Sequence, residues 1–374
     1  MLNGHGGNIN KICNAYGLNP EEIIDFSASI NPLGYPDSVR KAVLKRFDDI
    51  LNYPDSECTS LRKVIAETHS CNESNIIIGN GSNELFYLIP RALKPKRGII
   101  LQPAFSEFKD ALRNANIPIT DIINNNPVVL SLNDPGFKNI SNGMVFLCNP
   151  NNPTGHLIQK EQILKLARDN PKQLIVVDEA FMDFVEDEGK HSLVKEAPSV
   201  ENLIVVRSLT KFYGFPGLRL GYLVATESIT NNLLQFKEPW TVNALAQVAG
   251  KAALYDKMFA LNTRSFISTE KEFLYKSLSE IKGLYPFYPS VNFILVRVDI
   301  EEMTSSKIFD LLIEDNIIIR DCSNFAGLDN KYFRVAVRTR EENQSLLNLL
   351  RNVMNNRTVE NANEKKHIHD YITK

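Results

Sequence analysis

Short apolar runs and amphipathic segments alternate from about residue 60 to about residue 238 of the chain. The apolar runs carry no polar alternation, which is typical of strands that are buried on both faces of a parallel sheet. The segments between them repeat apolar residues at helical spacing. Strands are expected within residues 75–82, 98–103, 118–123, 143–150, 174–180 and 203–211. The pattern predicts an α/β domain whose mostly parallel sheet is sandwiched by helices, with right-handed crossovers.

The pattern changes near Pro239 and Trp240, where the chain becomes mainly helical. A mixed unit follows, with strand-like runs at 291–298, 317–320 and 331–337 and helical segments at 305–315 and 341–354. These runs predict a second, smaller α/β domain at the C-terminal side. Two domains also suit a chain of 374 residues, which is too long for one small core.

The first 40 residues lack a clear period, because glycine and proline interrupt them, and they predict an extended arm. Such an arm buries little apolar surface alone, so we expect it to lie over its own body or over a partner subunit. The predicted divisions are an arm over 1–36, a large domain over 37–238, a small domain over 239–355 that the arm completes, and a polar tail over 356–374.

Composition and charge exclude several classes of protein. The chain is 43% hydrophobic and 23% charged, as in ordinary globular enzymes, and its net charge of -2 offers no basic surplus for nucleic acid or an anionic membrane. Its five cysteines are scattered and never spaced C-x-x-C, which favours free thiols in a reducing compartment over disulfides or a metal site. No run approaches the length of a transmembrane helix, and the N-terminus lacks the apolar core of a signal peptide. We expect a cytoplasmic protein.

The stretch SLTKFYGFPGLRLGY, residues 208–222, places one lysine among hydroxyls and one arginine. Lys211 follows Ser208 and Thr210 and precedes Arg219. An amine condenses with an aldehyde to a Schiff base, while hydroxyls and a guanidinium hold a phosphate. Pyridoxal 5'-phosphate (PLP) is a cofactor with both groups. For this stretch alone, an ordinary loop lysine remains the alternative.

Three other stretches end predicted strands with polar residues. Asp178 closes the run LIVVD, where a buried carboxylate needs a partner such as a pyridinium nitrogen; capping of the next helix is the alternative. Asn152 lies in the turn NPNNPTG and is placed to donate its amide to a cofactor oxygen, unless the turn is plain connection. GNGSNE (79–84) offers the backbone N–H groups of Ser82 and Asn83 as a phosphate seat. Glu84 stands where a dinucleotide fingerprint would have its third glycine, and that fingerprint is therefore weak.

Together these motifs resemble the fold-type I PLP-dependent enzymes of the class I and II aminotransferase group, over about residues 20–350. Two branches of the group compete, the histidinol-phosphate aminotransferases and the threonine-phosphate decarboxylases of cobalamin biosynthesis. The opening HGGN, with DFSASINPLG and SLTKFYGFPGLRLGY, is more similar to the decarboxylases. The resemblance implies the PLP-dependent transferase fold and PLP as cofactor.

The resemblance also implies a role for each cofactor residue. Lys211 forms the Schiff base, Asp178 pairs with the pyridine nitrogen, and Asn152 bonds the phenolic oxygen. Phe105 stacks on the ring, with simple core packing as the alternative. The phosphate is held by Ser82, Asn83, Ser208, Thr210 and Arg219.

Two further positions bear on this site. Tyr53 of NYPD matches a tyrosine that reaches the cofactor phosphate from the neighbouring subunit, so the resemblance implies a homodimer. A surface turn tyrosine is the alternative. Three residues after Asp178 the chain has Phe181, where many aminotransferases carry a tyrosine that donates to the phenolic oxygen. This departure puts the protonation state of the Schiff base in doubt.

A small substrate with a carboxylate and a phosphate needs two anion anchors, and arginine offers the flat fork that fits both. By the resemblance, Arg334 binds the α-carboxylate and Arg320 binds the substrate phosphate. Arg338 is a near alternative anchor, unless it lies at the surface. A solvated ion-pair partner is the alternative for any single strand-end arginine. His5, Asn8 and Asn31 would complete the substrate pocket.

We expect PLP-dependent decarboxylation of an O-phospho-amino acid, threonine phosphate or serine phosphate, to a phosphorylated amino alcohol for cobamide nucleotide-loop synthesis. A histidinol-phosphate-type aminotransferase is the alternative, because the same lysine and arginines serve both and only the orientation of the bonds at the substrate Cα differs. A non-catalytic PLP-fold binding protein is disfavoured by the intact Lys211 and by the lack of a helix-turn-helix pattern. A nicotinamide dehydrogenase is disfavoured by the weak glycine fingerprint.

Overall fold

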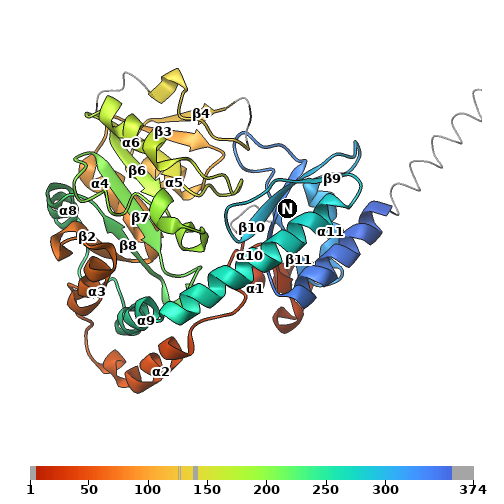
Figure 1. Cartoon of the computed structure of the whole chain (residues 1–374), viewed down its shortest axis with the longest axis horizontal. Coiled ribbons are helices and arrows are strands. Elements are labelled where there is room, and N and C mark those ends of the chain that lie inside the picture. Colours follow the sequence, from red (N-terminus) through yellow and green to blue (C-terminus); the bar gives the residue numbers. More distant parts are fainter. Residues whose placement is uncertain (1–5, 125, 127, 138–141, 356–374) are drawn as a thin grey trace, which may run out of the picture.

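Within the described residues, seven strands form the large sheet, in the order β2-β8-β7-β6-β5-β3-β4 (Figure 1). The computed structural model describes residues 6–124, 126, 128–137 and 142–355. The strands are β2 (Ile76–Asn80), β3 (Arg97–Gln102), β4 (Ile119–Ile123), β5 (Gly143–Cys148), β6 (Leu174–Asp178), β7 (Leu203–Ser208) and β8 (Leu220–Val224). Neighbouring strands are parallel except where β8 pairs with β2 and β7. The predicted mostly parallel sheet is confirmed, while β8 went unpredicted inside the glycine-rich stretch 208–222.

The central strands read as continuous apolar runs because both of their faces are covered. Along β5, Val145 and Leu147 belong to one hydrophobic cluster, and Met144 and Phe146 belong to another. Alternate side chains therefore point into two different cores, on opposite faces of the sheet. The helices around these cores are α2 (Asp37–Lys45), α3 (Thr59–His69), α4 (Gly81–Leu93), α5 (Glu107–Asn114), α6 (Lys160–Asp169), α8 (Glu227–Leu234) and α9 (Ala244–Tyr255).

A second sheet lies beside the first, and the long helix α10 (Lys257–Ser279) carries the chain across to it (Figure 1). Among the described residues this sheet is antiparallel, in the order β12-β13-β10-β9. Its strands are β9 (Leu284–Pro286), β10 (Phe293–Val298), β12 (Arg320–Asp321) and β13 (Tyr332–Ala336), with α11 (Ser305–Ile313) and a helix over 340–355. The predicted small α/β unit is present. The boundary predicted at 239 falls before α9, and it is α10 that crosses between the sheets.

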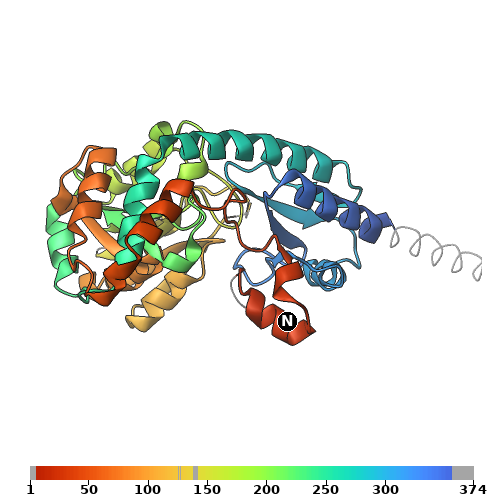
Figure 2. The same ribbon diagram turned by 90° about the horizontal axis from the view of Figure 1, so that it is seen from below.

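The N-terminal arm forms a separate two-stranded sheet with a strand of the small domain. After α1 (Ile9–Tyr16), β1 (Ile24–Asp25) pairs in parallel with β11 (Ile317–Ile318). Figure 2 shows α10 along one side of the molecule and the arm crossing on the other, so that two segments bridge the large and small domains. The predicted domain divisions, with the arm as part of the small domain, stay a prediction.

Neighbouring parallel strands end on polar residues at one edge of the large sheet. β3, β6 and β7 end at Gln102, Asp178 and Ser208, and β5 leads into the turn 149–155. Because parallel strands place their carboxyl ends at a common edge, these residues converge there, where open α/β sheets bind ligands. No helix in the described part of the chain is long and apolar enough to span a membrane.

Candidate active site

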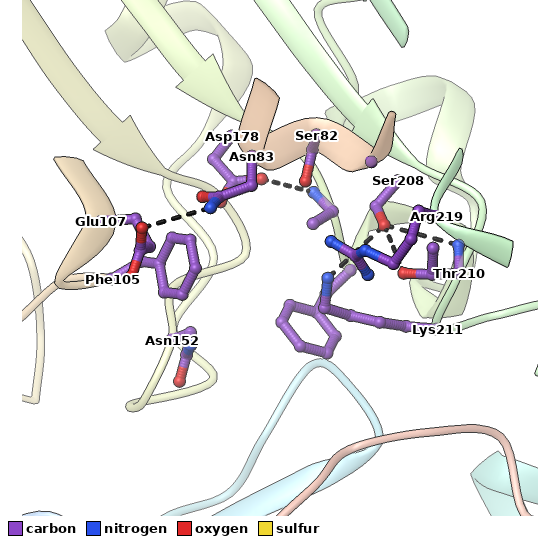
Figure 3. A pocket seen from close by; sticks show the side chains of 13 residues that line it. Ser82, Asn83, Phe105, Glu107, Asn152, Asp178, Ser208, Thr210, Lys211 and Arg219 are labelled. Atoms are coloured by element: carbon purple, nitrogen blue, oxygen red, sulfur yellow. Dashed lines mark hydrogen bonds between the residues drawn. The ribbon is translucent and has the colours of Figure 1, made fainter. Parts of the chain in front are cut away.

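A pocket of about 690 Å³, counted out to open solvent, lies at this edge (Figure 3). The structure brings together in it every cofactor residue predicted from the sequence except Tyr53. The lining residues are Gly81, Ser82, Asn83, Phe105, Glu107, Asn152, Asp178, Ala180, Phe181, Ser208, Thr210, Lys211 and Arg219.

Lys211 and Asp178 are the two ionisable groups at the centre of this pocket. The Lys211 ammonium lies 3.5 Å from Ser208 Oγ and 5.2 Å from the centre of the Phe181 ring. Desolvation lowers the pKa of Lys211, although the Asp178 charge opposes the shift. Desolvation also raises the pKa of Asp178 to about 6, and here Lys211 acts in the opposite direction. Both groups therefore lie where their charged forms are poorly solvated.

The surroundings of Asp178 suit a cationic ring nitrogen. Its Oδ1 accepts the Ala180 N–H at 2.9 Å, while Oδ2 has only the Cys148 thiol at 3.9 Å. The carboxylate is 4% exposed, and it forms no ion pair with any described residue. A buried carboxylate in this state is costly, and an N–H⁺ donor in the pocket would relieve that cost. The residues present thus fit the pyridine nitrogen of PLP.

A cup for a phosphate lies on the other side of Lys211. The Ser208 and Thr210 hydroxyls are 2.8 Å apart, and Arg219 has a left-handed backbone with φ 56°. Glycine is required beside this arginine: a Cβ at Gly81 would lie 2.7 Å from Arg219 Nη2, and one at Gly221 would lie 2.5 Å from the Ser82 nitrogen. The missing side chains leave the space that a phosphate needs between these donors.

Helix α4 directs its first turn at the same cup. It begins at Gly81, so the N–H groups of Ser82 and Asn83 are among those that no helical carbonyl can satisfy. Glu84, which weakens the dinucleotide fingerprint, accepts a bond from the Asn80 N–H and pairs with Lys237 at 3.1 Å. It therefore fixes the start of the helix instead of approaching the cofactor position.

Glu107 is a pocket residue that the sequence analysis missed. Its Oε2 accepts bonds from Asn83 Nδ2 at 3.2 Å and from Tyr87 Oη at 2.9 Å, and it lies next to Phe105 in Figure 3. Burial, and to a smaller extent the hydrogen bond to Glu107, raises the pKa of Tyr87 to about 12. Glu107 follows the end of β3, and the rule that sites lie at strand ends would have identified it.

Two aromatic rings bound the pocket. Phe105 lies across it from Lys211 in Figure 3 and contacts Phe108 edge-on at 5.7 Å, as a ring that stacks on a cofactor while resting on the core would. Phe181 packs edge-on against Phe293 at 5.0 Å. Its ring faces the Lys211 ammonium without offering a hydrogen-bond donor.

Arg334 connects three parts of the chain at the mouth of the site. Its Nη1 bonds Asn152 Oδ1, and its Nη2 donates to the Ser27 carbonyl at 2.7 Å. The turn that holds Asn152 belongs to the large domain, Ser27 belongs to the arm, and β13 belongs to the small domain. Burial lowers the pKa of Arg334 to about 10. An anionic partner would stabilise the charged guanidinium, which burial has deprived of water.

Arg320 stands directly opposite Arg334 in the β12–β13 pair. Its Nη1 donates to the Asp321 carbonyl at 2.6 Å, and its Nη2 donates to Asn324 at 2.9 Å. Two like charges on opposite strand positions repel each other unless an anion lies between or beside them. Arg338, the alternative, is occupied by the Asp25 carbonyl at 3.0 Å and by Glu342 at 2.7 Å.

The arm reaches Arg334 through Ser27. The Gly7 N–H donates to Ser27 Oγ at 3.0 Å, and a Cβ at Gly6 would lie 2.2 Å from the Ser27 carbonyl oxygen. Position 6 of the HGG motif therefore requires glycine, because any side chain there would collide with the Ser27 carbonyl. Asn8 is exposed and caps α1, accepting from Lys11 N at 3.3 Å, while His5 lies outside the described residues. The substrate roles of Asn8 and His5 stay predictions.

Asn31 is buried beside the lysine and not at the mouth of the site. Its backbone N–H donates to the Lys211 carbonyl at 3.0 Å, and its side-chain amide donates to Phe212 O at 2.8 Å and to Thr263 Oγ1 at 2.9 Å. These bonds hold the segment around Lys211 against the arm and α10. Its role as a substrate ligand stays a prediction.

Tyr53 lies away from the pocket of its own chain. Its side chain is 85% exposed, and its ring stacks at a tilt on Trp240 at 5.4 Å. A large aromatic residue this exposed needs another surface to cover it. The exposure of Tyr53 is compatible with a role in the pocket of a second subunit. That role stays a prediction.

Comparison with known proteins agrees with this site. The model of the family described as aminotransferase class I and II matches residues 21–350. A threonine-phosphate decarboxylase from Salmonella typhimurium is 36% identical over 94% of this chain and 96% of its own length. The solved structures of L-threonine-O-3-phosphate decarboxylase from Porphyromonas gingivalis and of histidinol-phosphate aminotransferase from Clostridium acetobutylicum are both 30% identical, with TM-scores of 0.79 and 0.82. Each covers 88% of this chain and 99% of the solved chain.

The raised pKa of Asp178 predicts a pH-dependent stability of the cofactor-free protein. A carboxyl whose pKa rises from 3.8 to about 6 on folding contributes stability below about pH 3.8 that is lost as the pH rises through about 6. Asp178→Asn removes this loss. The unfolding free energy of the variant, relative to the unaltered protein, should increase by about 1 kcal/mol between about pH 5 and about pH 8. Urea denaturation at the two pH values measures it, and a constant or falling difference would contradict the assignment.

Proposed function

Because the chain belongs to the class I and II aminotransferase family, we propose that it is a PLP-dependent enzyme that decarboxylates an O-phospho-amino acid. The substrate is L-threonine O-3-phosphate or L-serine O-phosphate, and the product is a phosphorylated amino alcohol for the nucleotide loop of cobamides. The observation that carries this proposal is the pair of opposed arginines, Arg320 and Arg334, of which Arg334 bonds the pocket residue Asn152. Two anion anchors suit a substrate with a carboxylate and a phosphate.

When bound, PLP supplies an aldehyde that condenses with amines and a ring that withdraws electrons from the substrate Cα. In this chain Asp178 holds the proton on the ring nitrogen. Asn152 donates to the phenolic oxygen, and Phe105 covers one face of the ring. The phosphate is held by the hydroxyls of Ser208 and Thr210, by Arg219, and by the N–H groups of Ser82 and Asn83.

Lys211 performs the proton transfer. Its lowered pKa increases the fraction of neutral amine near neutral pH, which is the nucleophilic form. The neutral Lys211 Nζ would first accept a proton from the substrate ammonium and, after the carboxylate leaves as carbon dioxide, would deliver that proton to the substrate Cα. Ser208 Oγ at 3.5 Å and the face of Phe181 guide the amine. Phe181 cannot donate a hydrogen bond. Of Phe181 and Asn152, therefore, only Asn152 would donate to the phenolic oxygen.

Arg334 and Arg320 decide which bond at Cα breaks. Arg334 binds the carboxylate and Arg320 binds the phosphate, so the substrate is held at both ends. The two anchors would set which bond at Cα is oriented for cleavage, and orientation of this kind changes barriers by several kcal/mol.

Decarboxylation is favoured over transamination by the relative from Salmonella typhimurium, whose name and nearly complete overlap support it. The arm motifs HGGN and DFSASINPLG support the same choice. A histidinol-phosphate-type aminotransferase remains the second candidate, because the Clostridium acetobutylicum structure matches as well as the decarboxylase structure does.

The active unit of the proposal is a homodimer in which Tyr53 contacts the cofactor phosphate of the partner. Support comes from a surface rich in exposed apolar residues around Tyr53, which monomeric proteins rarely leave uncovered. These residues are Leu44, Phe47, Ile50, Leu51, Trp240 and Tyr255. All five cysteines are free, which supports a reducing compartment such as the cytoplasm.

Incubation with each phospho-amino acid, without a keto acid, tests the reaction. We expect carbon dioxide and the phosphorylated amino alcohol from threonine phosphate, serine phosphate or both. Lys211→Ala should lose this turnover, since no amine remains to protonate Cα. Turnover only in the presence of 2-oxoglutarate, with histidinol phosphate as amino donor, would establish the aminotransferase instead.

Arg320→Met tests the phosphate anchor. Loss of a charged bidentate donor should lower kcat/KM for threonine phosphate about 100-fold, and it should leave the slow turnover of free threonine nearly unchanged. Arg338→Met is the matched control, because that guanidinium contacts the Asp25 carbonyl and Glu342. The role of Arg320 would be contradicted if Arg338→Met lost the preference for threonine phosphate over free threonine, or if Arg320→Met kept that preference.

Mixed dimers test whether Tyr53 acts across the interface. Tyr53→Ala and Lys211→Ala should each be nearly inactive, since each lacks one part of every site. After the two are unfolded and refolded together, half of the dimers carry one site with both residues intact. About a quarter of the wild-type activity should return. No recovery in dimers shown to be mixed would place Tyr53 outside the partner's site.

A further inference from the structure

Arg207 lies buried in a cluster of carboxylates directly behind the cofactor pocket. Its side chain is 1% exposed and contacts Glu179 Oε2 at 3.1 Å, Asp183 Oδ1 at 2.9 Å and Glu188 Oε1 at 2.7 Å. Ser192 links the same groups, because its hydroxyl donates to Glu179 at 2.6 Å and lies 3.2 Å from Arg207 Nη1. None of these residues lines the pocket.

The cluster is joined to the site through the chain itself. Glu179 follows Asp178, and Arg207 precedes Ser208. Within β7, Arg207 and Ser208 point to opposite faces, because successive side chains of a strand alternate. Asp178 and Ser208 line the pocket, whereas Arg207 and Glu179, which follows the end of β6, do not. Because each residue is bonded to its neighbour in the chain, contacts that fix Arg207 and Glu179 also fix Ser208 and Asp178.

The backbone ladder ends where this side-chain link begins. β6 pairs with β7 up to Asp178 and Val206, and one further bond runs from Glu179 N to Val206 O at 2.8 Å. Beyond that bond β6 gives way to a loop, while β7 continues through Arg207 and Ser208 in its pairing with β8. The Arg207–Glu179 pair spans this point and sets how far apart the strand ends lie.

The cluster also reaches other elements. Arg264 of α10 donates to the Asp183 carbonyl at 2.9 Å and pairs with Glu188, in α7 (Glu188–His191), at 3.2 Å. Burial raises the pKa of Glu179 to about 7, with the Arg207 charge opposing the shift. Arg207 thus holds carboxylates that would otherwise be expensive to keep ionised.

We infer that Arg207 and Glu179 are positioning residues for the proposed reaction, because they fix the Asp178 carboxylate relative to the Ser208 hydroxyl. The inference rests on the proposed cofactor, since Asp178 and Ser208 are assigned to its ring nitrogen and its phosphate. A small change in the spacing of two such groups weakens both contacts at once, because a rigid ligand cannot follow them separately.

Glu179→Gln is the test, since it keeps the size of the side chain and removes its charge. Glu270→Gln is the matched control: Glu270 is also buried and pairs with Arg340 at 2.9 Å, far along the chain from the cofactor strands. The readouts are the PLP dissociation constant, the pH midpoint of the visible absorption of bound PLP, and the urea midpoint of the cofactor-free protein.

We expect Glu179→Gln to weaken PLP binding about 10-fold and to displace the pH midpoint, while Glu270→Gln changes only the urea midpoint. Should Glu179→Gln fail to fold, Ser192→Ala removes one bond of the cluster and should weaken PLP binding about 3-fold. Folded variants with unaltered PLP affinity and pH midpoint would overturn the inference. If the unaltered protein binds no PLP, the proposed function itself fails, which is a separate outcome.

Discussion

The Asp178 carboxylate, held in a poorly solvated place opposite Lys211, is the constraint around which the structure is built. A charge at the end of a central strand is costly, so the chain surrounds it with the Ala180 N–H and the Cys148 thiol. These groups are too few to satisfy it fully. In the proposed enzyme a cationic ring nitrogen would satisfy the remaining demand, and desolvation lowers the pKa of Lys211 in the same pocket.

The small domain adds a second unsatisfied requirement, of the opposite sign. Arg334 is buried and bonded to Asn152 and to Ser27, while Arg320 faces it on the adjacent strand. The arm supplies the Ser27 carbonyl, so that the segment joined to β11 also orients Arg334, the proposed substrate anchor. In the proposed enzyme the Asp178 carboxylate and the two guanidinium groups would together favour a ligand that carries both charges.

The sequence was sufficient for the strands and their polar ends. β5 has no polar side chain, and β6 and β7 each begin with four apolar residues, so Asp178 and Ser208 follow from where those runs stop. β8 was not predictable in this way, because Gly221 and the nearby Arg219 make its sequence read as a cofactor loop. Glu107 was missed because its partners, Asn83 and Tyr87, lie on another helix. The position of Tyr53 needs a second chain, which no property of one chain supplies.

The Arg207 cluster shows another limit. Strand alternation places Arg207 on the face opposite Ser208, and that much follows from its position in β7. Their meeting with Glu188 and Arg264 depends on a loop and on α10, whose approach no local pattern records. Long-range pairs between loops and helices are set by the packing of the whole fold and not by the segments that contribute to them.

Helix α10 touches three regions at once: Thr263 meets Asn31 of the arm, Arg264 meets the buried cluster, and Glu270 meets Arg340 of the small domain. An α-helix turns by about 100° per residue. A single inserted or deleted residue between these positions would therefore rotate one set of partners away from the other. Over evolution this helix can vary widely in composition on its outer face, but its length between Thr263 and Glu270 is fixed by geometry.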